Sequence, residues 1–422
     1  MYFDRAGAET NWPEFLARIG AISAELCSRP GRYWALDIAD AAEFACALYG
    51  CWAAGKTPVL APRYMLVEDG EVACDGIIET GFGSAAAELG ERVIPATSDI
   101  VLFTSGSTGK PVKVYRTINN MEAELDVLES VFGEHIGNDG RVYATVSHAH
   151  VYGLLFRVLW PLVTQRAFAT FNFEYPENLL SEVGSDGALV TSPALLKRIG
   201  HLDAHEACNW RAVFSSGGLL PEHAAADAMR LLGACPFEVL GSTETSGVAW
   251  RQQGQHGAAE VWHTLPEVRV RQDGEGFLEV SSPFMGLSSW HRMGDKVRLE
   301  SDRSFELLGR GDHIVKIEEK RVSLAEIEQC AVALPEITDA AAVSLQAGAR
   351  QFVGLVLQLS DDGRDEFEQL GRKDFGIGLR RALSGYLDPV AVPKRFRYVD
   401  LIPVNPQGKR QPGEIRALFD DT

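Results

Sequence analysis

Short apolar runs alternate with longer amphipathic stretches through the first 240 residues of the chain. The apolar runs predict buried strands at residues 33–38, 57–60, 100–103, 141–147, 166–171, 188–191, 212–215 and 237–240. Helices are predicted between them at residues 40–54, 151–163, 193–200 and 221–232, and the second of these is apolar on nearly every side. This alternation predicts a mostly parallel sheet covered by helices on both faces.

The pattern changes near Phe277, where short strands replace the alternation of strand and helix. Strands are predicted at residues 276–281, 296–300, 304–308, 314–322, 340–345 and 352–359, and helices at residues 323–334 and 376–387. Ser323 and Glu326 form the sequence signature of a capping box at the first of these helices. We therefore expect an α/β protein with a large N-terminal domain (1–308), a joint (309–312) and a smaller α+β C-terminal domain (313–422).

Charge and cysteine content narrow the classes of function. The 422 residues include 40 basic and 58 acidic side chains, a net charge of −18, which argues against general nucleic-acid binding because phosphates require a positive field. Seven cysteines form no C-x-x-C pair, which favours reduced thiols in a cytoplasmic protein. We expect no signal peptide and no membrane span, because the chain lacks a basic and apolar N-terminus and a long apolar segment.

One predicted strand runs directly into a hydroxyl-rich loop, composed of Thr104, Ser105, Gly106, Ser107, Thr108, Gly109 and Lys110. Such a loop offers backbone N–H groups and hydroxyls to an anion, and glycine lets the backbone approach closely. It is not a P-loop of the Walker type, because Thr104 stands where that pattern requires Gly and Pro111 where it requires Ser or Thr. Taken alone, the segment is equally compatible with a polar turn after a strand.

Three further segments follow in a fixed order: Leu240-Gly-Ser-Thr-Glu-Thr245, Gly309-Arg-Gly-Asp312 and Asn405-Pro-Gln-Gly-Lys409. Together with the hydroxyl-rich loop they resemble the adenylate-forming superfamily, which comprises acyl- and aryl-CoA synthetases, adenylation domains and luciferases. The resemblance runs from about Asp37 to Lys409. It implies an enzyme that uses ATP and Mg²⁺ to join AMP to a carboxylic acid and then transfers the acyl group to a phosphopantetheine thiol.

The resemblance also implies roles for residues around the nucleotide. Glu244 would bind magnesium, because a hard cation prefers carboxylate oxygen, and Thr243 would bond the α-phosphate. Asp295 would accept the ribose hydroxyls through its two oxygens, and Arg310 would bond the ribose or a phosphate. The adenine-binding turn and the rest of the nucleotide site would comprise Ser216, Gly217, Gly218, Gly241 and Ser242.

The hydroxyl-rich loop would wrap the β- and γ-phosphates. Family members usually carry a lysine directly after the proline, where this chain has Val112. Lys110 and Lys113 are the alternative lysines for this position.

Two residues of the predicted C-terminal part have mechanistic roles in the resemblance. Asp312 would be the hinge about which a mobile C-terminal domain rotates between two half-reactions. Lys409 would be the catalytic lysine, stabilising charge between the carboxylate and the α-phosphate. Glu319 departs from the family, which usually has glycine there to shape the channel for the pantetheine thiol.

His150 lies in the segment Ser147-His-Ala-His-Val-Tyr-Gly153, which resembles the family segment beside the acyl pocket. The candidate pocket residues are His150, Tyr152, Phe214, Val248 and Trp250, which suit a flat aromatic acid and are equally compatible with a core position. The two histidines at i and i+2 lack an evident third metal ligand, which favours a pocket-lining or hydrogen-bonded core role over metal binding.

The sequence therefore predicts ATP-dependent adenylation of a carboxylic acid, aryl or acyl, followed by transfer to the thiol of an acyl carrier protein in trans. A ligase that uses free CoA is the alternative within this class, and a non-catalytic nucleotide-binding protein is the alternative outside it. The short chain and the Glu-Glu-Lys-Arg run at residues 318–321 resemble the stand-alone synthetases of aryl polyene and xanthomonadin-type clusters. Basic residues that suit an acidic carrier or CoA phosphates are Arg380, Arg381, Lys394, Arg395 and Arg397.

Overall fold

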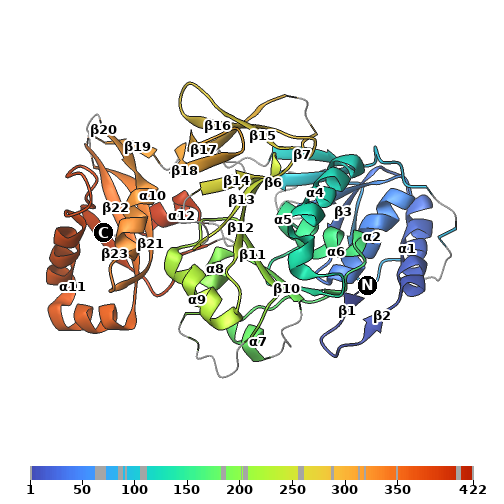
Figure 1. Ribbon diagram of the computed structural model, residues 1–422, viewed down its shortest axis with the longest axis horizontal. Coiled ribbons are helices and arrows are strands. Elements are labelled where there is room, and N and C mark those ends of the chain that lie inside the picture. The colour runs from blue at the N-terminus through green and yellow to red at the C-terminus, as the bar shows by residue number, and fades with distance from the viewer. Residues whose placement is uncertain are drawn as a thin grey trace. The chain divides into compact units, whose positions relative to one another are not determined.

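The computed structural model describes residues 2–61, 73–83, 89–90, 93–104, 112–181, 187–200, 202, 208–254, 261–286, 289–311, 314–317, 320–347, 350–404 and 410–420. These residues form two compact units, and most of their strands and helices are labelled in Figure 1. The first unit comprises residues 1–271, 279–291 and 300–305, and the second comprises residues 272–278, 292–299 and 306–422. Four strands carry residues of both units: β15 (Arg269–Gln272), β16 (Phe277–Ser281), β17 (His291–Leu299) and β18 (Ser304–Arg310).

A five-stranded sheet of the first unit ends in a β-hairpin. Its strands are β3 (Tyr33–Asp37), β4 (Thr57–Leu60), β5 (Gly76–Glu79), β6 (Asp99–Thr104) and β7 (Val112–Thr117). They lie in the order β5-β3-β4-β6-β7, and only β7 is antiparallel to its neighbour. Helices α1 (Trp12–Cys27) and α2 (Ala41–Ala53) contact each other, and the Asp40 side chain caps α2 by accepting the N–H groups of Ala42 and Glu43.

The second sheet of the first unit confirms the predicted run of parallel strands. The sheet includes β15–β18, and its other strands are β1 (Tyr2–Phe3), β2 (Glu9–Thr10), β8 (Arg141–Ala144), β9 (Phe168–Ala169), β10 (Gly187–Thr191), β11 (Ala212–Ser216), β12 (Phe237–Ser242), β13 (Ser246–Gln252) and β14 (Val261–Thr264). Strands β9, β8, β10, β11 and β12 are parallel neighbours in that order, and β13 and β14 continue the sheet in antiparallel pairing.

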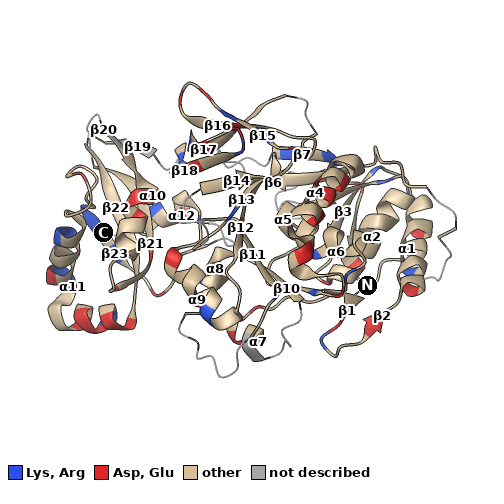
Figure 2. Ribbon diagram, viewed as in Figure 1, with Lys and Arg blue, Asp and Glu red and all other residues tan. Residues whose placement is uncertain are grey.

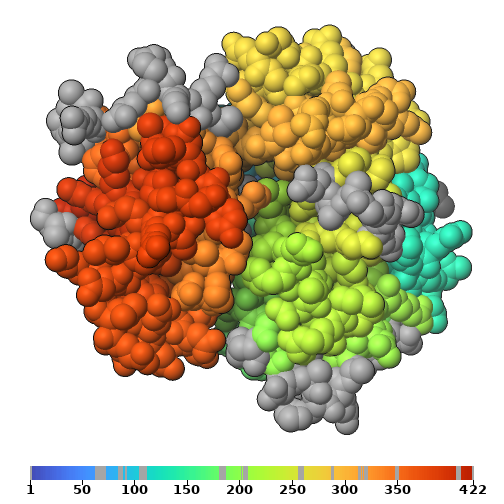
Figure 3. All heavy atoms as spheres, turned by 60° about the vertical axis from the view of Figure 1, so that its left-hand side comes forward, coloured from blue at the N-terminus to red at the C-terminus, as the bar shows by residue number. Residues whose placement is uncertain are grey.

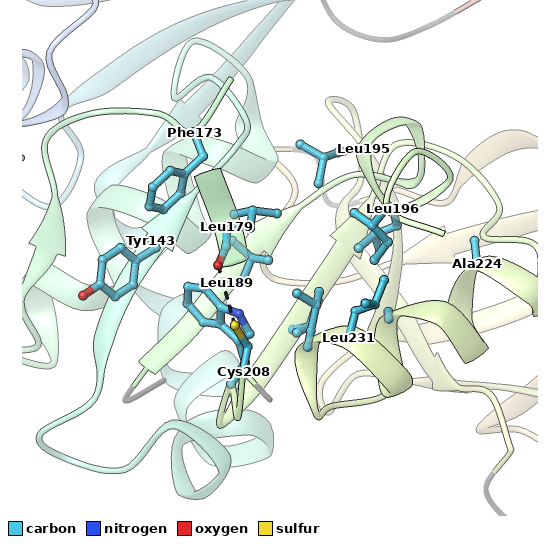
Figure 4. Packing of buried hydrophobic residues seen from close by; sticks show 14 of the residues in the cluster. Tyr143, Phe173, Leu179, Leu189, Leu195, Leu196, Cys208, Ala224 and Leu231 are labelled. Carbon is cyan, nitrogen blue, oxygen red and sulfur yellow. Dashed lines mark hydrogen bonds between the residues drawn. The ribbon is translucent and has the colours of Figure 1, made fainter. Parts of the chain in front are cut away.

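The remaining helices of the first unit pack around this sheet. They are α4 (Ile118–Ile136), α5 (Val151–Gly153), the π-helix η1 (Leu154–Leu159), α6 (Trp160–Val163), α7 (Pro176–Ser181), α8 (Pro193–Leu196) and α9 (Glu222–Leu232). Figure 4 shows how Leu189 of β10 packs with Leu195 and Leu196 of α8 and Leu231 of α9 in one buried cluster. Burial of these side chains supplies the hydrophobic driving force that fixes the helices on the sheet.

The second unit has its own core around a three-stranded sheet. Its elements are β19 (Ile314–Ile317), β20 (Lys320–Ser323), α10 (Leu324–Val332), β21 (Ile337–Ala347), β22 (Arg350–Leu359), α11 (Asp361–Leu383), β23 (Arg395–Tyr398) and α12 (Pro412–Ala417). Val353, Leu355 and Leu357 of β22 are completely buried within this core. The Ser323 hydroxyl accepts the N–H of Glu326, which confirms the predicted start of the helix that follows.

Several sequence predictions differ from the structure. The strand expected at residues 314–322 is instead the antiparallel pair β19 and β20, in which Ile317 pairs with Lys320. The helix expected at 376–387 begins already at Asp361 and is broken at Gly371, whose positive φ of 73° interrupts the helix. Residues 151–163 are helical as predicted, but their central turns form the π-helix η1. Helices α1 and α4 were not predicted.

Three findings bear on the expectations drawn from composition. All seven cysteines are free thiols. Within the described part of the chain, no helix is both long and apolar enough to cross a membrane. Among the same residues, no three or more His, Cys, Asp or Glu side chains cluster in a way that can hold a metal ion.

Candidate active site

The segment from Gly241 to Thr245 forms the tight turn that joins β12 to β13, and we call it the motif turn. Its ends pair in antiparallel register, Gly241 with Gly247 and Ser242 with Ser246. A Cβ atom at Gly241 would lie 2.3 Å from the Ser246 carbonyl oxygen, so this position requires glycine. The buried Thr245 hydroxyl accepts the N–H of Ser242 at 3.1 Å and donates to the Ser246 carbonyl at 3.1 Å. Internal bonds therefore fix the turn and leave the side chains of Thr243 and Glu244 half-buried at its tip.

A buried arginine from the five-stranded sheet supports the backbone of the motif turn. Arg116, on β7, is only 3% exposed, and its Nη2 donates to the carbonyl oxygens of Thr243 at 2.7 Å and Glu244 at 2.5 Å. Burial lowers the pKa of this guanidinium, and the charges of Glu124 and Glu244 oppose that shift. The guanidinium remains charged because arginine has a very high ordinary pKa. Both carbonyls are thus held by one cation.

Glu124, on α4, completes this support. Its carboxylate is 1% exposed and accepts the backbone N–H of Gly247 at 2.8 Å. Burial raises the pKa of Glu124, while bonds from the Ser246 side chain and the Gly247 backbone and the charge of Arg116 work in the opposite direction. Ser246 has a positive φ of 59°, an uncommon conformation for a residue with a side chain. The Glu124 contacts hold this strained residue at the base of the motif turn.

Sequence reasoning missed Arg116 and Glu124, although β7 carries a signal for the first. Burial alternates along this strand, with Val114 and Arg116 facing inward. An arginine at an inward position of an alternating strand indicates a buried, hydrogen-bonded charge, since arginine is almost never fully buried without partners.

The hydroxyl-rich loop is the connection of the β6–β7 hairpin. The two strands pair along their length, with Thr104 of β6 opposite Val112 of β7. The loop residues Ser105, Gly106, Ser107, Thr108, Gly109 and Lys110 lie outside the described residues, as does the side chain of Thr104. Arg116 lies on the strand that leaves this loop, so a single strand links the loop to the motif turn.

The predicted adenine-binding turn lies beside the motif turn at the carboxyl ends of adjacent parallel strands. Ser216 ends β11 and is the register partner of Val239 on β12. Its hydroxyl donates to the Val239 carbonyl at 2.8 Å. Gly217 has a positive φ of 94°, which favours glycine and redirects the chain after the strand. The structure thus brings residues 216–218 and the motif turn to one edge of the sheet, where α/β proteins commonly bind ligands.

Asp295 and Arg310 are neighbours within the second unit. Asp295, on β17, is 5% exposed. A Cβ atom at Gly294 would lie 2.9 Å from Nη2 of Arg310, so the β18 arginine passes directly over the backbone next to Asp295. Three other predicted residues lie outside the described residues, namely Asp312, Glu319 and Lys409.

The candidate acid-pocket residues belong to one aromatic cluster. Phe214 is completely buried at its centre, with its ring centroid 5.3 Å from those of both Phe156 and Phe132. The Phe156 ring lies 4.8 Å from Tyr152, and the Phe132 ring lies 5.8 Å from Trp250. Tyr152 and Trp250 are half-buried, as is His150 at the start of α5, whereas Val248 has no exposed surface. The candidates therefore range from fully buried core residues to half-buried ones at the margin of the aromatic cluster.

A buried His–Arg pair fixes the segment that leads into His150. Arg157, on η1, is 0% exposed and donates to the carbonyls of Val146 at 3.2 Å and Thr170 at 3.1 Å. Its Nη1 lies 3.2 Å from Nδ1 of His148, whose Nε2 lies 2.8 Å from the Ile38 carbonyl. Burial, followed by the Arg157 charge, lowers the pKa of His148 to about 3. His148 is therefore a neutral core histidine that accepts from Arg157 and donates to Ile38, which is the core role left open by the sequence.

Comparisons with known proteins agree with this arrangement. A family model described as AMP-binding enzyme matches residues 75–275. The 4-coumarate–CoA ligase of Cereibacter sphaeroides is 24% identical over 309 residues, which cover 72% of this chain and 68% of that protein. Phenyloxazoline synthase MbtB of Mycobacterium tuberculosis is 30% identical over 185 residues, covering 44% of this chain and 11% of that protein. The structure of a benzoate CoA ligase from Burkholderia xenovorans LB400 shares the fold, with a TM-score of 0.82, 19% identity and coverage of 98% of this chain and 96% of that one.

Replacing Arg116 by methionine should destabilise the protein by about 2–3 kcal/mol, because two carbonyls lose a charged donor and Glu124 loses a nearby cation. Urea unfolding measures this loss. Arg32→Met is the matched control, since that exposed guanidinium pairs with Asp99 at the surface and should contribute less than about 1 kcal/mol. Equal unfolding midpoints for Arg116→Met and the wild type would contradict the supporting role.

The lowered pKa of His148 predicts how the stability of the fold depends on pH. The folded state favours the neutral His148 ring. The stability that this preference contributes is fully present above the ordinary histidine pKa of 6.5, and it is lost as the pH falls from 6.5 toward about 3. His148→Gln keeps a donor and an acceptor without titrating, so urea stability should fall less between about pH 8 and about pH 5 than in the wild type. His223→Gln, at an exposed helix position, serves as control and should change nothing. A pH dependence unaltered by His148→Gln would refute this role.

Proposed function

Because the chain belongs to the adenylate-forming superfamily, as an AMP-forming acid–thiol ligase, we propose that it activates an aryl or acyl carboxylic acid for transfer to a phosphopantetheine thiol. In the first step a carboxylate oxygen attacks the α-phosphorus of ATP and pyrophosphate leaves. In the second step the thiolate attacks the acyl carbon, a thioester forms, and AMP leaves with the electron pair of the broken bond. ATP and the thiol donor are thus co-substrates.

The observation that carries this proposal is the Arg116 link between two loops of anion-binding chemistry. Arg116 precedes Thr243 by 127 residues, and its bonds join β7, the strand that follows the hydroxyl-rich loop, to the backbone of the motif turn. We propose that the loop residues 104–110 bind the β- and γ-phosphates and that Thr243 bonds the α-phosphate. Residues 216–218, with Gly241 and Ser242, would line the adenine side, and Asp295 and Arg310 would bind the ribose.

The donor set around Glu244 suits a magnesium ion. Glu244 is a half-buried carboxylate at the tip of a rigid turn, and the described residues offer no cluster of three ligands there. Mg²⁺ usually takes one or two carboxylates and completes its shell with water and substrate phosphates, so a single positioned carboxylate is sufficient. When bound, the ion would spread the charge of the phosphates during attack. The contribution of the chain is to hold the Glu244 carboxylate at that place.

Lys409 would supply the remaining positive charge. The attacking carboxylate and the α-phosphate are both anions, and a cation between them lowers the barrier as charge builds in the transition state. Asp312 would be the hinge that brings the C-terminal domain into position, and Glu319 would form part of a thiol channel built differently from that of family members with glycine. Either Lys110 or Lys113 would assist the phosphate loop.

An aromatic acid fits the pocket candidates best. Tyr152, Trp250 and His150 are half-buried, whereas Phe214 and Val248 have no exposed surface, and both Tyr152 and Phe214 contact Phe156. Flat apolar side chains of this kind favour an aromatic ring over a flexible acyl chain.

The acceptor we propose is an acyl carrier protein acting in trans, as in aryl polyene-type synthetases, and free CoA is the alternative. Free thiols at all seven cysteines agree with a cytoplasmic setting.

We expect pyrophosphate release that depends on ATP, magnesium and one class of acid, with benzoates or cinnamates preferred over fatty acids. The assay is coupled detection of pyrophosphate across these acids, with CoA and holo-carrier protein supplied as competing thiols. The preferred thiol should be acylated first. Measurable ATP binding without pyrophosphate release from any acid would overturn the proposal in favour of a non-catalytic nucleotide-binding protein.

Lys409→Ala should lower acid-dependent ATP–pyrophosphate exchange by at least about 100-fold and leave ATP binding within about twofold, because the charge acts mainly in the transition state. Lys56→Ala is the control, since the Lys56 amine bonds the carbonyls of Arg29 and Gly31 and has no proposed role at the nucleotide. An exchange rate unchanged by Lys409→Ala would refute its assignment as the catalytic lysine.

A further inference from the structure

Helix α11 separates its charges into two arms at the break at Gly371. The arm before Gly371 is acidic, with the residues Asp361, Asp362, Asp365, Glu366 and Glu368 against the single cation Arg364. The arm after Gly371 is basic, with the residues Arg372, Lys373, Arg380 and Arg381 against the single anion Asp374. Figure 2 shows red on the first arm and blue on the second. We call the second arm the basic arm.

A cavity of about 330 Å³ lies between the basic arm and β23. Its lining includes the cations Arg372, Lys373 and Arg380 and the apolar side chains Ile377, Phe396 and Tyr398. The guanidinium carbons of Arg372 and Arg380 lie 5.9 Å from the Tyr398 ring centroid and 5.6 Å from that of Phe396. Ile377 is 51% exposed. The surface beside the cavity thus combines positive charge with one exposed apolar side chain.

Most cations of this surface form no ion pair with a described carboxylate. Within the described part of the chain, no carboxylate lies within ion-pair distance of Arg372, Lys373 or Arg381. Arg380 is held in place by the carbonyls of Pro393 at 3.2 Å and Lys394 at 3.1 Å. The exposed side chains of Lys394 and Arg395 extend the positive surface beyond the cavity. We call Arg372, Lys373, Ile377, Arg380, Arg381 and Lys394 together the basic patch.

We propose that the basic patch docks an acidic helical surface of the carrier protein that delivers the thiol. The proposal rests on the proposed function, because it names the partner of the second half-reaction. Charge complementarity selects an acidic partner, since the patch concentrates positive charge on a chain of net charge −18. The patch extends beyond the cavity and carries an exposed apolar anchor, which fits an amphipathic acidic helix better than the phosphates of free CoA. Figure 3 shows one face of the C-terminal part of the chain, coloured orange to red.

The physical consequence is electrostatic steering with a small apolar contact. Opposite potentials raise the association rate of two proteins, and salt weakens this effect because it screens exposed charges. Loss of one patch cation should therefore raise the KM for the carrier and reduce its salt dependence. Adenylation should remain intact, because the acid and ATP do not need the patch.

The test compares Arg372→Glu with Arg364→Glu, which makes the same charge change on the acidic arm of the same helix. Acid-dependent pyrophosphate exchange, loading of a recombinant holo acyl carrier protein and acylation of CoA are measured for each variant. We expect Arg372→Glu to raise the carrier KM by about fivefold or more, with exchange and the CoA KM unchanged, and Arg364→Glu to leave all three unchanged. Ile377→Ser should also raise the carrier KM.

Three results would overturn the docking proposal. They are an unchanged carrier KM in Arg372→Glu, an equal rise of the CoA KM, which would assign the patch to CoA phosphates, and no loading of the carrier despite normal exchange. Each leaves the adenylation proposal standing. Absence of acid-dependent exchange in the wild type would instead defeat the proposed function, so the two failures are distinguishable.

Discussion

The bonds from Arg116 to the backbone of the motif turn are the interaction on which the candidate site depends. A charged donor within 2.7 Å of two consecutive carbonyls fixes the backbone that carries Thr243 and Glu244. A hydrogen bond to a charged group is stronger than one between neutral groups, and the low local dielectric strengthens it further. The same arginine belongs to β7, which pairs with β6 in the five-stranded sheet, so its bonds join that sheet to the motif turn of the other sheet.

The surrounding residues explain why this arginine can be buried. Glu124 provides a nearby negative charge and at the same time bonds the N–H of Gly247 behind the turn. Gly241 leaves room for the crossing backbone, and Thr245 closes the turn from within. The support is thus a network in which the Arg116 Nη atoms, the Glu124 carboxylate and the Thr245 hydroxyl have partners, whereas the buried Arg116 Nε has none among the described residues. Buried polar groups that are paired in this way favour a single conformation of the turn.

Local patterns predicted much of the fold because strands and helices follow from hydrophobic periodicity. The parallel strands β8, β10, β11 and β12 and the turns at their carboxyl ends were foreseen in this way. The Arg116 contacts could not be, because they join residues 127 and 128 positions apart and leave no local trace beyond an inward-facing arginine. Helix α1 could have been found, since Asn11 and Glu14 form a capping box and Pro13 stands in the first turn. The π-helix η1 was beyond sequence reasoning, because buried helical turns of either kind share the same apolar pattern.

The central claim is that Arg116 contributes to activity by fixing the backbone of the motif turn, and so by positioning Glu244. A double-mutant cycle of Arg116→Met and Glu244→Gln, read out as acid-dependent ATP–pyrophosphate exchange in folded protein, tests it directly. If the arginine serves only to position Glu244, the double variant should lose no more activity than Glu244→Gln alone, giving a strongly non-additive cycle. Losses that multiply, as for two independent residues, would contradict this account.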